Sequence, residues 1–461
     1  MADKLIPGTR VLCVEQETGR AVPGFFKYSK SDIEAKLTAF DGFVYIPENQ
    51  RITLLTEHLE FITLFQNIVR TGSRWKNSEP ALNCDTLWIQ SNLAVIGQCP
   101  WKEGMHVKQA SFEVPHARRI LENQKLKSQL SGEHWYKEAG RDLFRSKAGD
   151  VEVSVWYSAS YTGGDDFPSE WTPRFDVRFD HPRPIDGFTD TLSLVSSFLS
   201  FCLGAQLSWD QVTVSNMDDV EIEMAIKTKD MFDYHQVIFL QSDFQPNMDG
   251  TGNWGSPCLC YDDGEARAFS ECLAAWIERA PRWKTAYGLM MAYLRHRGTI
   301  GPDRLLNACK CLERIPGAES LGVVDNEDVQ KVIEAAQNAA SNLGHSHLSE
   351  RLAFAIRRVG NEDHETRFQR LLSGLLGGRL IQREPSERMI SDLKKAMHLR
   401  GHAAHSTLHA NTDKEFQTLA RAISAVECLC FLLLASDLPI SQAGKERLHG
   451  NPIMSDYVNA Y

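Results

Sequence analysis

A polar stretch, Asp243–Pro257, separates two halves of the chain that differ in pattern. It is rich in Gly, Pro, Asn and Asp, which favour turns, so it predicts a linker. Before it, turn residues break up short apolar runs; after it, apolar residues recur at helical spacing over longer segments. At 461 residues, the chain is also too long for one ordinary domain. The sequence therefore predicts a multidomain α+β fold, with a β-rich domain over residues 1–255 and an all-α helical bundle over residues 256–461.

Short strands are predicted throughout the first half, because several runs alternate apolar and polar residues as a half-buried sheet does. One segment, Asp190–Leu203, is predicted as a helix on the sheet. This half contains no Gly-rich phosphate loop, nucleophile elbow or metal-spaced ligand set, so we expect it to bind or sense rather than to cut. The predicted strands are Arg10–Val14, Ala35–Phe40, Gly42–Ile46, Arg51–Thr56, Phe61–Phe65, Thr86–Ile89, Leu93–Ile96, Ala110–Val114, Val151–Tyr157, Arg174–Phe179 and Val237–Leu240.

Long helices are predicted in the second half, with prolines and glycines marking the breaks between them. They are Gly264–Ala280, Trp283–His296, Pro302–Leu312, Asn326–Asn342, Leu348–Val359, Glu365–Gly374, Ser386–His409 and Asp413–Ser436.

Charge and cysteine usage limit the function classes. The formal net charge is −10, so nucleic-acid binding would need a local basic patch. Such a patch exists between Arg351 and His405, where eleven basic and six acidic residues leave a balance of +5. The eleven cysteines are scattered, which indicates reduced thiols in a cytoplasmic protein. The start has no apolar signal region, and Cys428–Ala435 is far too short to cross a membrane.

The candidate catalytic residues lie in one segment, which contains Arg400 and four histidines. Arg400 precedes His405 by five positions, and His398, His402, His405 and His409 fall within about 60° on an ideal helix. Imidazoles titrate near neutral pH and serve as acid or base, while a guanidinium offers a fork of donors to phosphate oxygens. Arg400 and His405 therefore predict half of an RNA-cleaving site. A solvated histidine face remains an alternative.

The helical half resembles a HEPN domain of the ApeA-like type. The resemblance is carried by Arg304–Glu313, Leu348–Phe354, Ile390–Arg400 running into His405, and a final helix over Phe416–Leu434. The β-rich half is similar to the region that accompanies this HEPN type, notably around Gly24, Arg51–Thr56 and Phe61–Asn67. In that family the residue after the arginine is commonly polar, whereas here it is Gly401, and His402 is the substitute we consider.

The resemblance implies a metal-independent RNA endonuclease of an antiphage or toxin-like system. It implies Arg400, His405 and His402 as catalytic residues, with no cofactor and no metal. RNA, with tRNA as one candidate, would be the substrate, and a phage-derived trigger would activate the protein. Two HEPN domains pair in this family, so a homodimer, which can assemble further, would complete the site.

Two other functions stay open. Gly401 favours a noncatalytic HEPN adaptor that dimerises and senses a partner. His398 and His402, four positions apart, could instead bind zinc in a metal hydrolase. Leu399 stands where the H-E-x-x-H motif has its glutamate, so that zinc-protease motif is absent.

Overall fold

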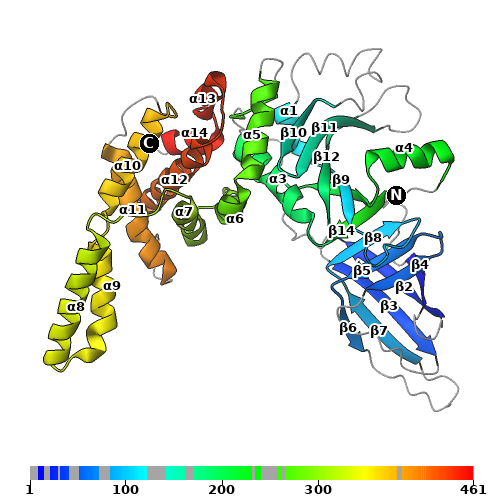
Figure 1. Ribbon diagram of the computed structural model, residues 1–461, viewed down its shortest axis with the longest axis horizontal. Helices are drawn as coiled ribbons and strands as arrows, with labels where there is room; N and C mark the ends of the chain where they lie inside the picture. Colours follow the sequence, from blue (N-terminus) through cyan, green and yellow to red (C-terminus); the bar gives the residue numbers. More distant parts are fainter. Residues whose placement is uncertain are drawn as a thin grey trace. The chain divides into compact units, whose positions relative to one another are not determined.

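The structure of the protein is a computed structural model (Figure 1). It describes most of the chain, with several gaps. The described residues are 9–14, 21–29, 32–40, 51–71, 84–121, 142–160, 170–230, 234–239, 257–261, 265–381, 387–405, 408, 410 and 412–459. Most of the predicted linker Asp243–Pro257 and the predicted strand Gly42–Ile46 lie outside these residues.

The fold class is α+β, as the sequence predicts. The chain forms two compact units. The β unit comprises Met1–Arg118, Asn123–Ser196 and Leu207–Thr251, and the helical unit comprises Arg119–Glu122, Ser197–Gln206 and Gly252–Tyr461. The predicted boundary at residues 255 and 256 stays a prediction, because the chain around it is not described.

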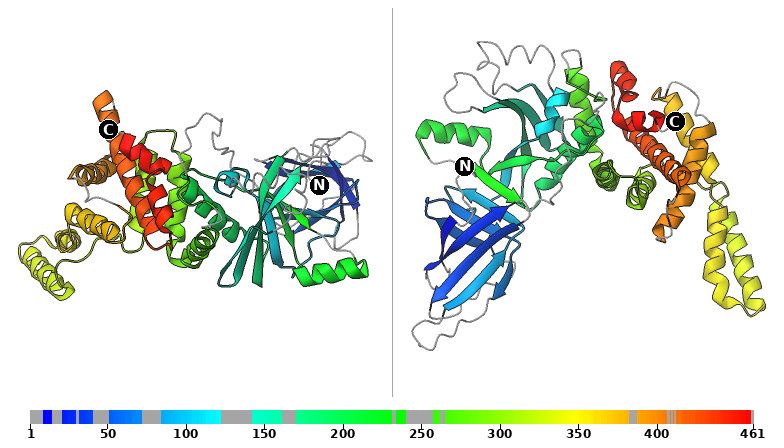
Figure 2. Two further views of the ribbon diagram at one scale, coloured as in Figure 1. Left: turned by 90° about the horizontal axis from the view of Figure 1, so that it is seen from above. Right: turned by 180° about the vertical axis from the view of Figure 1, so that it is seen from behind.

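The β unit is built on one sheet, in which every strand pairing described is antiparallel. Its spatial order is β10-β11-β12-β9-β13-β14-β8-β5-β4-β1-β2-β3-β7-β6 (Figures 1 and 2). The strands are β1 (Thr9–Val14), β2 (Ala21–Ser29), β3 (Asp32–Phe40), β4 (Ile52–Thr56), β5 (Phe61–Phe65), β6 (Ile68–Thr71), β7 (Cys84–Gln90), β8 (Leu93–Gly97), β9 (Val107–Glu113), β10 (Phe144–Ala148), β11 (Val151–Ser160), β12 (Glu170–Arg183), β13 (Asp210–Ser215) and β14 (His235–Phe239).

Alternation along the strands gives the sheet two different faces. In β12, Phe175, Val177 and Phe179 are buried, while the residues between them are half-buried and polar. Strands β1 to β5, β7 and β8 share an apolar core, to which Phe26, Leu54 and other side chains contribute. The predicted helix Asp190–Leu203 is confirmed as α3 (Thr189–Leu203), and α4 (Asp219–Thr228), which the sequence analysis missed, follows β13.

The helical unit is an all-α bundle. After a short first element, α1 (Arg118–Leu121), and the last turns of α3, its helices begin at Ala266. They are α5 (Ala266–Glu278), α6 (Ala280–Arg295), α7 (Pro302–Arg314), α8 (Asn326–Asn342), α9 (Ser349–Val359), α10 (His364–Gly377), α11 (Glu387–Ala404), α12 (Asp413–Ser436), α13 (Gln442–Leu448) and α14 (Pro452–Asn459). All eight predicted helices correspond to members of this series.

Helix α12 is the core of the bundle. A capping box between Thr412 and Glu415 starts it, and its side chains from Ala422 to Ala435 are all buried. It packs against α7, α10, α11 and α14. By length and composition alone α12 could also cross a membrane, but 83% of its apolar window is buried within the structure, which a core helix equally explains.

Candidate functional site

Helix α11 carries the predicted site, and it is shorter than predicted. Leu393, Ala396 and Ala403 are buried against the bundle, so one stripe of the helix is fixed by packing. The helix ends at Ala404, His405 lies in the following turn, and Leu408 is outside any helix. The predicted helix Ser386–His409 is therefore wrong at its end. The side chain of His409 lies outside the described residues.

Arg400 is held by a carboxylate of α7. Its Nη1 lies 2.6 Å from Oε1 of Glu313, and its Nη2 donates a hydrogen bond to Oε2 at 2.9 Å. Both side chains are about one-third exposed. A two-point pair of this kind fixes the plane of a guanidinium as well as its position. Glu313 engages both terminal nitrogens, and no other described residue is bonded to this guanidinium, so part of its five N–H donors remains for phosphate oxygens.

The histidines lie at the solvent-facing end of α11. His398, His402 and His405 are all exposed. The rings of His398 and His402 contact each other edge-on, with centroids 4.9 Å apart. Among the described residues, no hydrogen bond or ion pair joins Arg400 to His405: Arg400 pairs with Glu313 of α7, and His405 lies in the turn after α11.

The surroundings of Arg400 are buried and charged. Burial raises the pKa of the Cys309 thiol to about 12, with Arg400 and Arg367 acting in the opposite direction. Burial lowers the pKa of Arg367, whose Nε donates to the carbonyl of Ala318 at 2.7 Å, while the nearby Glu313 carboxylate opposes that shift. Glu313 therefore interacts electrostatically with both arginines.

Part of the basic stretch predicted between Arg351 and His405 is neutralised by ion pairs. Arg370 pairs with Glu362, Lys394 pairs with Glu365, and Arg400 pairs with Glu313. On α9, Arg351, Phe354 and Arg357 line a hollow of about 770 Å³, to which Glu350 also contributes. The ring of Phe354 is 70% exposed, so α9 presents an aromatic side chain between two cations.

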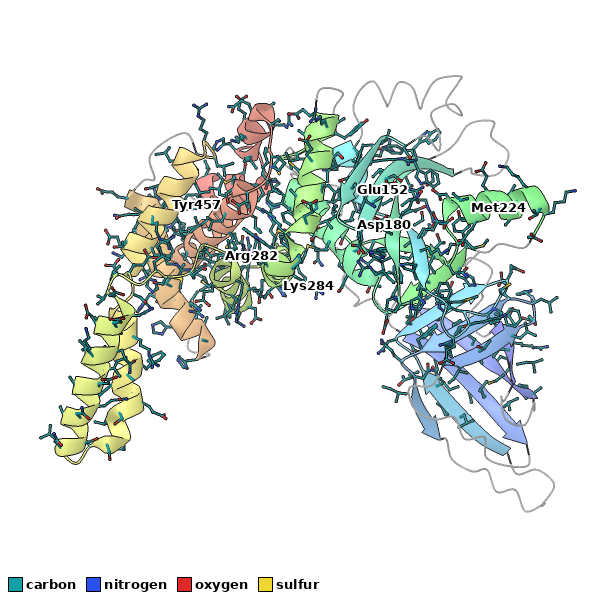
Figure 3. All side chains as sticks on the ribbon, viewed as in Figure 1. Glu152, Asp180, Met224, Arg282, Lys284 and Tyr457 are labelled. Atoms are coloured by element: carbon teal, nitrogen blue, oxygen red, sulfur yellow. The ribbon has the colours of Figure 1, made fainter. Side chains whose placement is uncertain are left out.

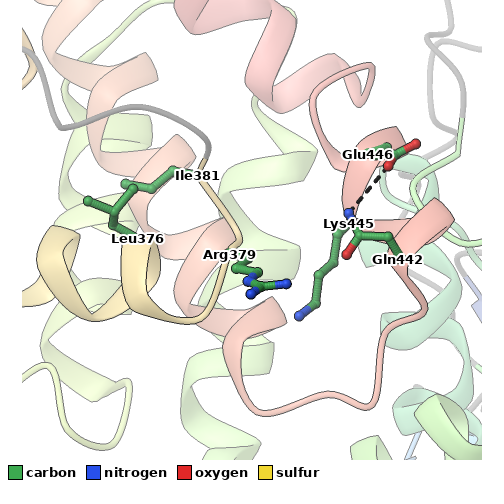
Figure 4. Close-up of a pocket in the computed structure, with 6 residues that line it drawn as sticks. All are labelled: Leu376, Arg379, Ile381, Gln442, Lys445 and Glu446. Carbon is green, nitrogen blue, oxygen red and sulfur yellow. Dashed lines mark hydrogen bonds between the residues drawn. The ribbon is translucent and has the colours of Figure 1, made fainter.

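A second hollow of the helical unit contains none of the predicted site residues. It measures about 310 Å³ and is lined by residues at the end of α10 and along α13 (Figure 4). Arg379 and Lys445 both line it, and Nζ of Lys445 donates to the carbonyl of Gly378 at 3.1 Å. Among the residues that the structure describes, no group of three or more His, Cys, Asp or Glu side chains could hold a metal ion.

Comparison with known proteins decides the family. The family model described as ApeA N-terminal domain 1 matches residues 14–253, which is just over half of the chain. The chain belongs to this ApeA family. Membership indicates a protein of an ApeA-type antiphage system. No curated protein and no solved structure matches the chain.

The ApeA match confirms the resemblance of the β-rich half and stops before α5 begins at Ala266. The HEPN character of the helical unit thus remains a prediction, as do the roles of Arg400, His402 and His405. Glu313 is a site residue that the sequence analysis missed. Glu313 is the last residue of the Arg304–Glu313 stretch that carries part of the resemblance. Its hydrogen bond to Arg400 joins residues 87 positions apart, so it depends on how α7 packs on α11 and cannot be read from local sequence.

Proposed function

We propose that this ApeA-family protein is a metal-independent RNA endonuclease, with a HEPN site composed of Arg400, His405 and His402. The observation that carries the proposal is the Glu313–Arg400 pair. The pair holds the guanidinium of Arg400, with spare donors, near the end of α11. His402 in the last turn of α11 and His405 just after the helix are both exposed.

The chemistry follows from the substrate. RNA carries its own nucleophile, because the 2′-oxygen can attack the adjacent phosphorus while the bond to the 5′-oxygen breaks. A neutral imidazole takes the proton of the 2′-hydroxyl, and a protonated one gives a proton to the departing 5′-oxygen. Arg400 stabilises the charge that develops on the phosphate oxygens. The products are a 2′,3′-cyclic phosphate and a 5′-hydroxyl.

A dimer resolves the separation of Arg400 from His405 within one chain. Across a two-fold axis, Arg400 of one protomer can face His405 of its partner, so that two protomers supply two arginines and the imidazoles for both proton transfers. The exposed position of His405 after α11 leaves it accessible to a partner chain.

Single-stranded RNA also fits the surface of α9. Exposed aromatic rings stack on bases and nearby arginines bind phosphates, which is the arrangement of Phe354 with Arg351 and Arg357. A structured RNA such as tRNA offers unstacked loop nucleotides of this kind.

The experiment is cleavage of total RNA by the purified full-length protein in EDTA, with chemical mapping of the new ends. We expect a 2′,3′-cyclic phosphate and a 5′-hydroxyl from the wild type. Arg400→Ala and His405→Ala should each lower the rate by about 10²-fold or more. His398→Ala should lower it much less, because its ring contacts His402 but has no role in the proposed site.

Products that carry a 5′-phosphate, or strict dependence on a divalent ion, would contradict this chemistry. A folded and dimeric protein without any RNA cleavage would instead support the noncatalytic adaptor. The observation that favours the adaptor is Gly401, which stands where the family commonly has a polar residue.

A further inference from the structure

The polar face of the sheet in the β unit contains a cavity of about 430 Å³. Its walls come from β9, β11, β12, β13 and α4, together with Tyr234 before β14. The volume lies within the range of small-molecule sites. The lining residues are Gln109, Ala110, Ser111, Trp156, Arg174, Asp176, Arg178, Thr213, Asp219 and Tyr234.

Strand register explains why these side chains converge. Asp176 of β12 lies opposite Ser111 of β9, which in turn lies opposite Thr213 of β13. Directly opposed residues of antiparallel strands point to the same face. The pairing of β13 with β9 shifts between Asp210 and Thr213, and Gln211 takes a φ of 48° there. A bulge of this kind bends the strand and redirects its side chains.

Helix α4 gives the cavity a side wall. Asp218 and Glu221 form a capping box that starts the helix, and Nζ of Lys108 on β9 binds both carboxylate oxygens of Glu221 at 2.6 and 2.7 Å. Nε of Arg178 donates to Asp219 at 2.8 Å, which connects β12 to the same end of α4. Figure 3 labels Glu152 on β11 and Met224 on α4, the strand and the helix that contribute Trp156 and Asp219 to the cavity.

A carboxyl group lies between two guanidinium groups in this cavity. Nε1 of Trp156 donates to Oδ2 of Asp176 at 2.9 Å. Burial raises the pKa of Asp176, although hydrogen bonds from Ser111 and Trp156 and the two arginines oppose the shift. The carboxyl can thus accept hydrogen bonds from a ligand and, when protonated, can also donate one.

The two arginines differ in how far their donors are used. Arg174 donates to Ser111 at 2.6 Å and to Glu113 and Thr213 at 3.2 Å each. Arg178 donates through Nε to Asp219 and through Nη1 to Ser154 at 2.9 Å. Among the described residues, none accepts a hydrogen bond from Nη2 of Arg178.

Two further groups suit a ring-bearing ligand. Trp156 and Tyr234 bring aromatic rings to the cavity, and burial raises the pKa of the Tyr234 hydroxyl, with Asp219 and Asp176 adding to the shift. Gln236 lies opposite Thr213 and therefore on the same face. Its Oε1 is buried without a hydrogen-bond partner in the described part of the chain, although Gln236 is not among the residues that line the cavity.

We infer that this cavity binds a nucleoside phosphate. The base would lie against Trp156 and Tyr234, its N–H groups would donate to the carboxylate of Asp176, and Nη2 of Arg178 would donate to the phosphate. Aromatic rings stack on bases, a carboxyl group reads base edges that carry N–H donors, and guanidinium groups bind phosphate oxygens. A neutral sugar would offer Arg178 no anionic acceptor. The site lies wholly in the ApeA domain and does not depend on the proposed nuclease.

The test is calorimetric titration of the full-length protein with each of the four ribonucleoside 5′-monophosphates, and with ribose 5-phosphate and inorganic phosphate. We expect at least one monophosphate to bind, and ribose 5-phosphate and inorganic phosphate to bind at least about tenfold more weakly because they lack a base. Asp176→Asn and Arg178→Gln should each weaken that binding by about tenfold or more.

Two controls make the outcome specific. Arg145→Gln removes an arginine of the same sheet that pairs with Asp142 and does not line the cavity, so binding should be unchanged. Arg400→Ala should also bind as the wild type does, because the proposed nuclease site is separate. Circular dichroism of each variant confirms that it is folded.

Three results would overturn the inference. The first is that no monophosphate binds below about 1 mM. The second is that folded Asp176→Asn and Arg178→Gln proteins bind as tightly as the wild type, which would place the ligand elsewhere. The third is equal binding of ribose 5-phosphate, which would remove the role assigned to the aromatic rings.

Discussion

Among single residues, Glu313 controls the position of the proposed catalytic arginine. Glu313→Gln removes the charge and one of the two acceptors while keeping the size of the side chain. Because a misplacement of about 1 Å can lower catalysis about 10²-fold, we expect RNA cleavage to fall between about 10- and 100-fold. The fall should appear mainly in kcat, measured on a defined RNA at saturating substrate.

Glu365→Gln is the matched control. Glu365 of α10 also pairs with α11, through Nζ of Lys394 at 2.5 Å, but it does not contact Arg400. Its loss removes an exposed ion pair and should leave cleavage within about twofold of the wild type. Equal losses in the two variants would show that Glu313 acts on the stability of α11 and not on Arg400.

Gly401 gives a second prediction, this time for stability. It lies within α11, and a Cβ added there would meet nothing within 4 Å. Glycine inside a helix costs about 0.5–1 kcal/mol relative to alanine, so Gly401→Ala should raise the free energy of unfolding by about that amount. Urea denaturation measures it. A stable variant with impaired cleavage would show that His405 needs the flexibility of this glycine, whereas a loss of stability would contradict the open surroundings of Gly401.

Among the helices, α7 and α12 are joined by a buried ion pair. Nε and Nη2 of Arg304 each donate to Glu427 at 2.7 Å, and Nη1 donates to the carbonyls of Arg297 and Thr299. Glu427→Gln should destabilise the protein by about 3–5 kcal/mol, because it leaves a buried guanidinium without its counter-charge.

The double variant Arg304→Met with Glu427→Met tests that reason. It removes both charges together, so the loss of stability should be clearly smaller than in Glu427→Gln, as chemical denaturation would measure. A double variant that is less stable than the single one would mean that the pair itself, and not the unpaired charge, dominates the energy.

The strands show which elements local pattern can predict. The second half of β12 alternates strictly between buried and half-buried residues from Arg174 to Phe179, and the prediction for that segment is confirmed. Strand β2 was missed because Pro23 and Gly24 are typical of a break. The structure gives the reason for Gly24, where a Cβ would lie 2.3 Å from the carbonyl oxygen of Lys36 on the neighbouring strand.

The candidate site was also predictable only in part, because local pattern does not show contacts between distant segments. Arg400 and His405 are close in sequence, so spacing and residue type reveal them. Glu313 belongs to another helix, and nothing in its own neighbourhood distinguishes it from other surface acids. The end of α11 at Ala404 was also missed, because the histidine spacing continues the helical pattern beyond the point where the chain turns.

For the whole chain, the helical unit should not be stable when it is cut out as residues 256–461. It also includes Ser197–Gln206. Phe201 packs against Trp276 and Phe431, and Ser197 accepts a hydrogen bond from Nε1 of Trp276 at 3.0 Å. Losing one such phenylalanine costs about 3–5 kcal/mol, so the fragment should be insoluble or unfolded while the full chain is not. A folded, soluble 256–461 fragment, judged by circular dichroism and sedimentation, would contradict this assignment.

The proposed dimer is the other property of the whole molecule that can be tested. It is part of the proposed mechanism, because no described hydrogen bond or ion pair joins Arg400 to His405 within one chain. Mixed dimers of an Arg400→Ala chain and a His405→Ala chain hold one Arg400 and one His405, in different protomers. If the arginine acts on the phosphate across the two-fold axis from the histidine, one of the two composite arrangements is restored and RNA cleavage returns in part. If both copies of each residue are needed, no cleavage returns, but the wild type still sediments as a dimer. The proposed site fails if the wild type cleaves at full rate as a monomer at nanomolar concentration, shown by sedimentation and turnover in the same buffer, since a single chain would then contain every catalytic group.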